Sequence, residues 1–244
     1  MNKYLEDFDE YETQSELWRD SHMITADVRL NPEAAKKVLP MGLRLTDSPT
    51  ATLFIVDYKQ PNFTAPYREA AMLIHVKTLF SSGLHCCWMT VDDDTAMIYG
   101  RELLGYPKKM ADIDYEESSQ VSEAKVHRRG KTVLSMRASK GEKQSMPSPV
   151  FDRKMYNTGG LGNFTLLQGL WLSRSKERII ESYSADIQIE LVDSLSDPIK
   201  PLIADTTAIN PRIVNFDIIK GKYLLPVGLS GISWYQRTSH LRVR

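Results

Sequence analysis

The chain has 244 residues, of which 42% are hydrophobic and 25% are charged, as is ordinary for one large globular domain or two small ones. Its 31 lysines and arginines balance its 31 aspartates and glutamates, which argues against nucleic acids and acidic membranes as partners. The chain has no run of eighteen apolar residues, and its acidic, polar beginning is unlike a secretory signal. We therefore expect a cytoplasmic protein whose partners are a small molecule and further copies of itself.

The first predicted element is a short helix after Asn31. An asparagine cap, a proline in the first turn and the letters EAAKKVL predict a helix that ends before Pro40. A second helix begins near Asp93 or Asp94 and carries TAMIYGRELL; Gly105 and Pro107 follow it as stop signals.

Predicted strands dominate the rest of the chain. Apolar or alternating runs predict strands over 51–58, 70–80, 84–91, 119–127, 131–138, 163–171, 178–192 and 222–235. Residues 127–131 are expected to form a hairpin turn, and 146–149 and 158–162 to form loops within one domain. Because helices rarely separate the strands, we expect a mainly β fold: an antiparallel barrel or sandwich with a few flanking helices.

The cysteines and acidic residues do not predict a metal site. Cys86 and Cys87 are neighbours, and a disulfide between them would be strained, so we expect two buried free thiols in a reducing compartment. Together with five scattered histidines they give no metal-ligand spacing, so we expect no metal. Asp92, Asp93 and Asp94 precede the second helix, where capping explains them better than metal binding.

Two adjacent lysines follow the second helix, at Lys108 and Lys109. Like charges usually lie in a solvated turn, and the negative end of a helix favours a charged amine by about 0.3–1 kcal/mol. The alternative is chemical, because an unprotonated lysine is a nucleophile. A free lysine has a pKa of about 10.4, and lowering it to near 7 requires roughly 4–5 kcal/mol, which desolvation and a neighbouring cation can supply.

At these residues the chain resembles the acetoacetate decarboxylase family, whose signature is Gly-Arg-Glu on a helix followed by Pro-Lys-Lys. Here the two parts are 100–102 and 107–109. Acetoacetate decarboxylase is the usual example of a lysine activated by its surroundings. The resemblance therefore implies that Lys108 forms a Schiff base without a cofactor and that Lys109 is its charged neighbour. It also implies one cone-like β-barrel domain, here 21–244 after an N-terminal arm at 1–20, and a homo-oligomer.

The likeness extends along most of the chain. VRLNPEAAKKVLP at 28–40, the segment 190–193 and the letters DPI and INP match the family, and so does Tyr-x-Glu at 67–69. By that match Glu69 faces the reactive lysine. Family decarboxylases also have a pocket arginine and a second glutamate, but the corresponding positions here are Ser21 and Phe54, with Arg19 two residues away as a possible replacement.

Several candidate residues have a structural explanation as well. Glu69 forms either the proton-transfer group or an exposed pair with Arg68. Arg101 contributes to the pocket or to an ion pair on the helix surface. Met89 and Tyr106 provide either apolar pocket walls or ordinary core packing. Tyr235 provides either a hydroxyl that acts as an acid or base in the pocket or ordinary barrel packing.

The predicted function is a Schiff-base lyase that decarboxylates a β-keto acid through an imine and an enamine. The missing arginine and second glutamate motivate an alternative, an aldolase-dehydratase or cyclase that uses the same imine on a 2-oxo acid such as pyruvate. A third possibility is a non-catalytic member of the family that binds a small molecule.

Overall fold

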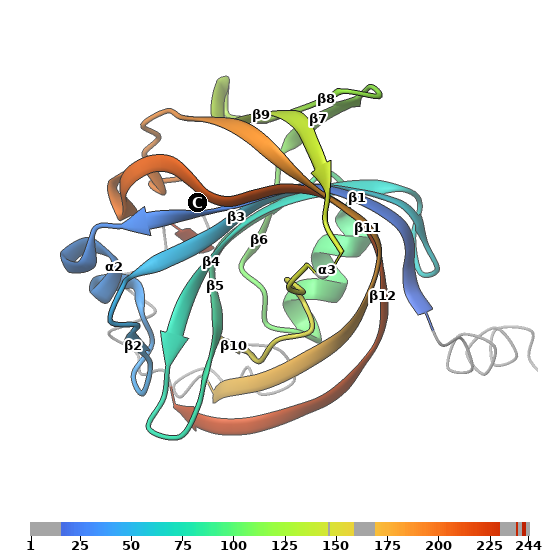
Figure 1. The fold of residues 1–244 in the computed structure, drawn as a ribbon. Helices are drawn as coiled ribbons and strands as arrows, with labels where there is room; N and C mark the ends of the chain where they lie inside the picture. The colour runs from blue at the N-terminus through green and yellow to red at the C-terminus, as the bar shows by residue number, and fades with distance from the viewer. Residues whose placement is uncertain (1–15, 146, 159–168, 230–237, 239–240, 243–244) are drawn as a thin grey trace, which may run out of the picture.

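The structure is a computed structural model that describes residues 16–145, 147–158, 169–229, 238 and 241–242. The fold is mainly β, as expected, with a large mixed sheet (Figure 1). Its elements in chain order are β1 (Glu16–Leu30), α2 (Pro32–Val38), β2 (Arg44–Leu45), β3 (Thr50–Pro61), β4 (Tyr67–Lys77), β5 (Ser82–Val91), α3 (Asp94–Glu102), β6 (Lys108–Met110), β7 (Asp112–Glu117), β8 (Val121–Arg128), β9 (Lys131–Lys143), β10 (Met155–Thr158), β11 (Gly169–Leu191), the 3-10 turn η1 (Lys200–Leu202) and β12 (Ile203–Leu229).

The strands follow one path, β10-β5-β4-β3-β1-β12-β11-β9-β8-β7. β10 pairs with β11 as well as with β5, so part of the sheet curves into a ring. The closure is narrow, because β5 and β10 share one register pair, Leu84 with Met155. Figure 1 shows α3 and β6 within the curve made by β11 and β12.

The two faces of the sheet bury two hydrophobic clusters, because side chains alternate along each strand. On β3, Leu53 and Ile55 belong to one cluster, whereas Phe54 and Val56 belong to the other. The second cluster also contains Ala96 of α3 and residues of β1, β4, β5 and β12. We call this second cluster the inner core, and it surrounds the candidate site.

Both predicted helices are confirmed with their caps. The Asn31 side chain accepts hydrogen bonds from the first turn of α2, and Asp93 accepts one from the backbone N–H of Ala96 at 2.7 Å. The hairpin turn is confirmed too, since β8 and β9 are joined through Arg129 and Gly130, both with positive φ.

The sequence pattern missed two long strands. β1 begins at Glu16, so five residues of the expected N-terminal arm belong to the sheet. β12 begins at Ile203, whereas the predicted strand began at 222. Both strands have register shifts, and Asp20 and Asn210 have positive φ, which breaks the alternation that a simple pattern needs. Residues 163–168 and 230–235 of the predicted strands lie outside the described residues.

Two further expectations concern the thiols and the membrane. Cys86 and Cys87 are buried and free, as predicted. In the part of the chain that the structure describes, no helix combines the length and apolar character needed to cross a bilayer.

Candidate active site

Lys108 is buried in the inner core beside a carboxylate. β6 pairs in parallel with β5, with Lys108 opposite Met89, and only 5% of the lysine is exposed. Its Nζ lies 2.6 Å from Oε2 of Glu69 and donates to the carbonyl oxygen of Ala96 at 3.2 Å. Glu69, on β4, is 4% exposed. A solvated turn therefore does not describe Lys108, and an exposed strand pair does not describe Glu69.

Helix α3 shapes the space that the lysine side chain occupies. A Cβ on Gly100 would lie 2.4 Å from Cε of Lys108, so only glycine leaves room for the side chain in this position. Arg101 donates to the backbone carbonyl of Lys108 at 2.9 Å and to that of Arg242 at 3.1 Å. Arg101 thus holds the backbone of Lys108, and among the described residues it forms no ion pair.

The amine lies beside the first turn of α3, although Lys108 follows the helix in sequence. The chain reverses after Gly105, which has a φ of 69°, and the strand then returns along the helix until Nζ reaches Ala96. The amine therefore lies along the side of α3, between the Ala96 carbonyl and Gly100, which is two residues before the helix ends at Glu102.

The walls around the amine are largely apolar and aromatic. Met89 is 1% exposed and belongs to the inner core together with Tyr58 and Tyr67. Nζ of Lys108 lies 5.6 Å from the ring centroid of Tyr67, whose hydroxyl accepts a hydrogen bond from Trp18 at 2.8 Å. Burial, followed by the charge of Glu69, raises the pKa of Tyr67 well above its usual value, so this hydroxyl stays protonated.

Tyr106 packs against the inner core at the other side of the lysine backbone. Burial, then the proximity of Cys86 and of Glu69, raises the pKa of Tyr106, and its hydroxyl is also bonded to Asn157. Tyr106 therefore adds a neutral polar group near the candidate site.

The structure does not bring Lys109 to the reactive amine. Adjacent strand residues face opposite sides, so Lys109 points away from the inner core. Its amine bonds the carbonyl of Ser196 at 2.8 Å and forms a buried ion pair with Asp197. Asp197 also accepts from Trp88 at 2.9 Å and pairs with Arg128 at 2.9 Å. The expected role as a cation beside Lys108 is thus corrected: Lys109 is compensated by a carboxylate of its own.

The remaining positions singled out in the sequence lie on β1 and β3 or outside the described residues. Arg19 is exposed on β1 and pairs in register with Gln60, so it does not supply a buried pocket arginine. Ser21 and Phe54 are fully buried, and Oγ of Ser21 has no hydrogen-bond partner among the described residues. Tyr235 lies outside the described residues.

Sequence reasoning missed the structural roles of Gly100, Asp197 and Asn157. Gly100 was part of the family signature, but its purpose is visible only once Lys108 is placed against it. Asp197 belongs to the matched letters DPI, yet nothing local indicates that it meets a lysine 88 residues away. Asn157, 2% exposed and adjacent to Cys86 and Tyr106, carried no sequence signal.

Comparison with known proteins identifies the family of this chain. The sequence model of the family "Acetoacetate decarboxylase (ADC)" matches residues 8–214. The chain belongs to the acetoacetate decarboxylase family. Among curated proteins it is 26% identical over 110 residues to Decarboxylase DEC1 of Cochliobolus heterostrophus, covering 45% of this chain and 43% of the relative. It is 30% identical over 112 residues to the CLA biosynthesis isomerase of Lactiplantibacillus plantarum, covering 44% of this chain and 40% of the relative. Each match thus spans less than half of the relative.

Solved structures of family proteins share the fold over most of this chain. Acetoacetate decarboxylase from Legionella pneumophila has a TM-score of 0.77 at 14% identity, with 88% of each chain covered. The enduracididine biosynthesis enzyme MppR, in complex with pyruvate, has a TM-score of 0.69 at 16% identity, covering 86% of this chain and 90% of MppR. These identities are too low to show more than the common fold.

Proposed function

We propose that this family member is a cofactor-independent lyase that decarboxylates a β-keto acid through an imine on Lys108. The observation that carries the proposal is the buried amine of Lys108 at 2.6 Å from the Glu69 carboxylate, between apolar walls. The family membership supports a lyase.

The contact between Lys108 and Glu69 provides a route to the nucleophile. Moving one proton across the 2.6 Å gap converts the ammonium and carboxylate into an amine and a carboxylic acid, with no change in net charge. The nitrogen lone pair then attacks the ketone carbon, and water leaves to give a protonated imine. This cation occupies the place of the former ammonium, so a carboxylate at position 69 balances its charge.

Carbon dioxide leaves from the carbon next to the imine, and the electrons of the broken bond move into the imine to give an enamine. The Glu69 carboxylate takes up a proton from solvent water and passes it to the enamine carbon, and hydrolysis of the new imine returns the free lysine. Ala96 and Arg101 keep the nitrogen in place during these steps, because they hold the amine and the backbone of Lys108.

A second candidate function is an aldol condensation with dehydration on a 2-oxo acid through the same imine. The observation that favours it is the pair of buried, uncharged side chains at Ser21 and Phe54, where family decarboxylases have an arginine and a glutamate. Without these charges the carboxylate of acetoacetate lacks its expected partners near the lysine.

Borohydride trapping tests the common step. The protein is incubated with acetoacetate, or with pyruvate and an aromatic aldehyde, reduced with borohydride and examined by mass spectrometry of its peptides. We expect trapping at Lys108, its loss in Lys108→Ala and its retention in Lys109→Met. No adduct with either acid would reject the imine mechanism. Release of carbon dioxide from acetoacetate, without condensation of pyruvate, distinguishes decarboxylation from the aldol reaction.

A further inference from the structure

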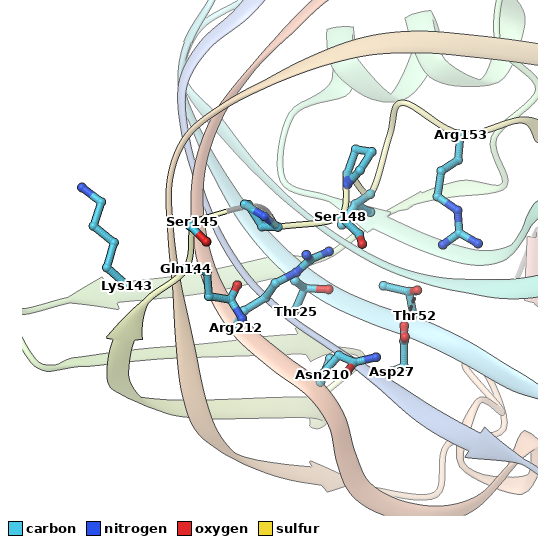
Figure 2. Close-up of a pocket in the computed structure, with 14 residues that line it drawn as sticks. Thr25, Asp27, Thr52, Lys143, Gln144, Ser145, Ser148, Arg153, Asn210 and Arg212 are labelled. Carbon is cyan, nitrogen blue, oxygen red and sulfur yellow. Dashed lines mark hydrogen bonds between the residues drawn. The ribbon is translucent and has the colours of Figure 1, made fainter.

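A cavity of about 890 Å³ lies away from Lys108, where residues 144–145 and 147–153 face β1, β3 and β12 (Figure 2). Its lining includes Thr52 but neither Lys108 nor Glu69. Thr52 is four residues along β3 from Val56, which pairs with Glu69, and four strand residues span about 13 Å. The cavity is therefore separate from the space around the amine.

Aromatic rings occupy the interior between the two places. Phe54 lies between Thr52 and Val56 on the same face of β3 and packs edge-on against Phe151, with centroids 5.4 Å apart. Phe151 in turn packs against Phe216 at 5.6 Å. A ligand in the cavity is thus screened from the candidate active site by packed side chains.

Two guanidinium groups are the main cations of this cavity. Figure 2 shows Arg153 and Arg212 directed into it from opposite sides. Both residues are half-buried, and among the described residues neither has a hydrogen-bonded or ion-paired carboxylate. Burial lowers the pKa of both guanidinium groups, and the charges of Glu177 on Arg212 and of Asp27 on both oppose this effect. Two partly desolvated guanidinium groups that both face the cavity form an arrangement that a bound anion would stabilise.

The carboxylate of the cavity is already engaged elsewhere. Asp27 accepts a hydrogen bond from Thr52 at 2.6 Å and lies 3.5 Å from Nε2 of His75. Lys143 at the rim pairs with Glu181 at 2.7 Å. Subtracting the one charge of Asp27 from the two arginines leaves a net charge of about one positive, which suits a monoanion better than a dianion.

The wall that carries Arg153 is held in place by a buried acid. Oε2 of Glu177 accepts hydrogen bonds from the backbone N–H groups of Val150 at 2.8 Å and Phe151 at 2.6 Å. This anchor fixes the segment before any ligand arrives, and such preorganisation favours binding. Pro149 and Val150 add an apolar surface to the lining.

We propose that this cavity binds an organic monocarboxylate, with its carboxylate between Arg153 and Arg212 and its hydrocarbon part against Pro149 and Val150. The volume suits an organic molecule, since ligand pockets commonly measure roughly 300–1,000 Å³. Arginine pairs recognise planar carboxylates through paired hydrogen bonds. The site is independent of the imine chemistry proposed for Lys108.

Calorimetric titration with butyrate tests the proposal, with inorganic phosphate as a second arm. We expect saturable butyrate binding that weakens by roughly tenfold or more in Arg153→Gln and in Arg212→Gln. Arg137→Gln, which removes an exposed arginine paired with Glu123, is the matched control and should bind as the wild type does. Lys108→Ala should also bind unchanged, which separates this site from the candidate active site.

Thermal unfolding of each variant without ligand establishes that the fold is intact, and Arg212→Lys retains the charge should Arg212→Gln fail to fold. Weaker butyrate binding by Arg212→Lys supports recognition by the guanidinium. Absence of saturable binding, unchanged affinity in the folded arginine variants, or loss of binding in Lys108→Ala would each overturn the proposal. Phosphate that binds as tightly as butyrate would overturn the assignment to a carboxylate.

Discussion

Replacing Gly100 with alanine should separate catalysis from stability. The added Cβ would lie 2.4 Å from Cε, 2.7 Å from Cδ and 3.0 Å from Nζ of Lys108. Ordinary contact begins at 3.4 Å, so the lysine side chain must move by about 1 Å. Lys108 then loses its position against Glu69, and a misplacement of this size lowers the rate about 100-fold.

The same substitution should leave the fold intact. All three atoms that the new methyl group meets belong to one lysine side chain, which rotates more easily than backbone moves. Alanine also stabilises a helix interior by about 1 kcal/mol relative to glycine. We therefore expect equal or slightly higher stability in urea, together with borohydride trapping that is about 100-fold slower.

Gly228→Ala is the matched control, because its added Cβ would meet nothing nearer than Leu170 at 3.8 Å. It should trap substrate at the wild-type rate. The reasoning is refuted if Gly100→Ala also traps at the wild-type rate, since the side chain then has room that the structure denies. A loss of several kcal/mol of stability would equally refute the claim that only the lysine must move.

Three further predictions concern buried charges. Glu69→Gln should slow trapping by about 100-fold to 10,000-fold, because it removes the group that transfers protons. It should also destabilise the fold by about 3–5 kcal/mol in urea unfolding, because it leaves the cation of Lys108 unpaired. Adding Lys108→Met should restore most of the stability, and no recovery would contradict this cause. Asp197→Asn should destabilise by about 3–5 kcal/mol, since Lys109 and Arg128 both lose a buried partner; an unfolding midpoint equal to that of the wild type would refute the structural role. Burial lowers the pKa of His85 to about 4, so below pH 6.5 the unfolded chain takes up a proton that the folded chain does not. The contribution of the neutral His85 to the free energy of unfolding is therefore complete above pH 6.5, and about 3 kcal/mol of it should be lost as the pH falls to 4. Urea unfolding across this pH range should show a smaller loss of stability in His85→Gln.

The parts of the fold that the sequence predicts are those with regular local patterns. The continuous apolar runs in β3, β4 and β5 indicate buried strands, and the caps of α2 and α3 are set by side chains a few residues away. β1 and the first part of β12, before the predicted start at 222, escaped prediction because bulges shift the alternation within each strand. Their register depends on pairing partners that are distant in sequence.

The candidate site divides in the same way. Family resemblance pointed to Lys108 and Glu69, but periodicity alone does not reveal that β4 and β6 bring them to 2.6 Å. The expectation for Lys109 failed on a local rule, because a short strand after Pro107 turns adjacent side chains to opposite faces. Had the strand been recognised, the sequence would have predicted that separation.

The short strand β6 carries both the candidate nucleophile Lys108 and a contact with a distant part of the chain. Lys109 docks on Asp197, which follows it by 88 residues, while Lys108 enters the inner core from the same backbone. A chain that has not yet brought its later half into place therefore lacks one of the contacts that hold this short strand. The time course of borohydride trapping at Lys108 with a keto acid during refolding therefore reports when the segments around β6 come together.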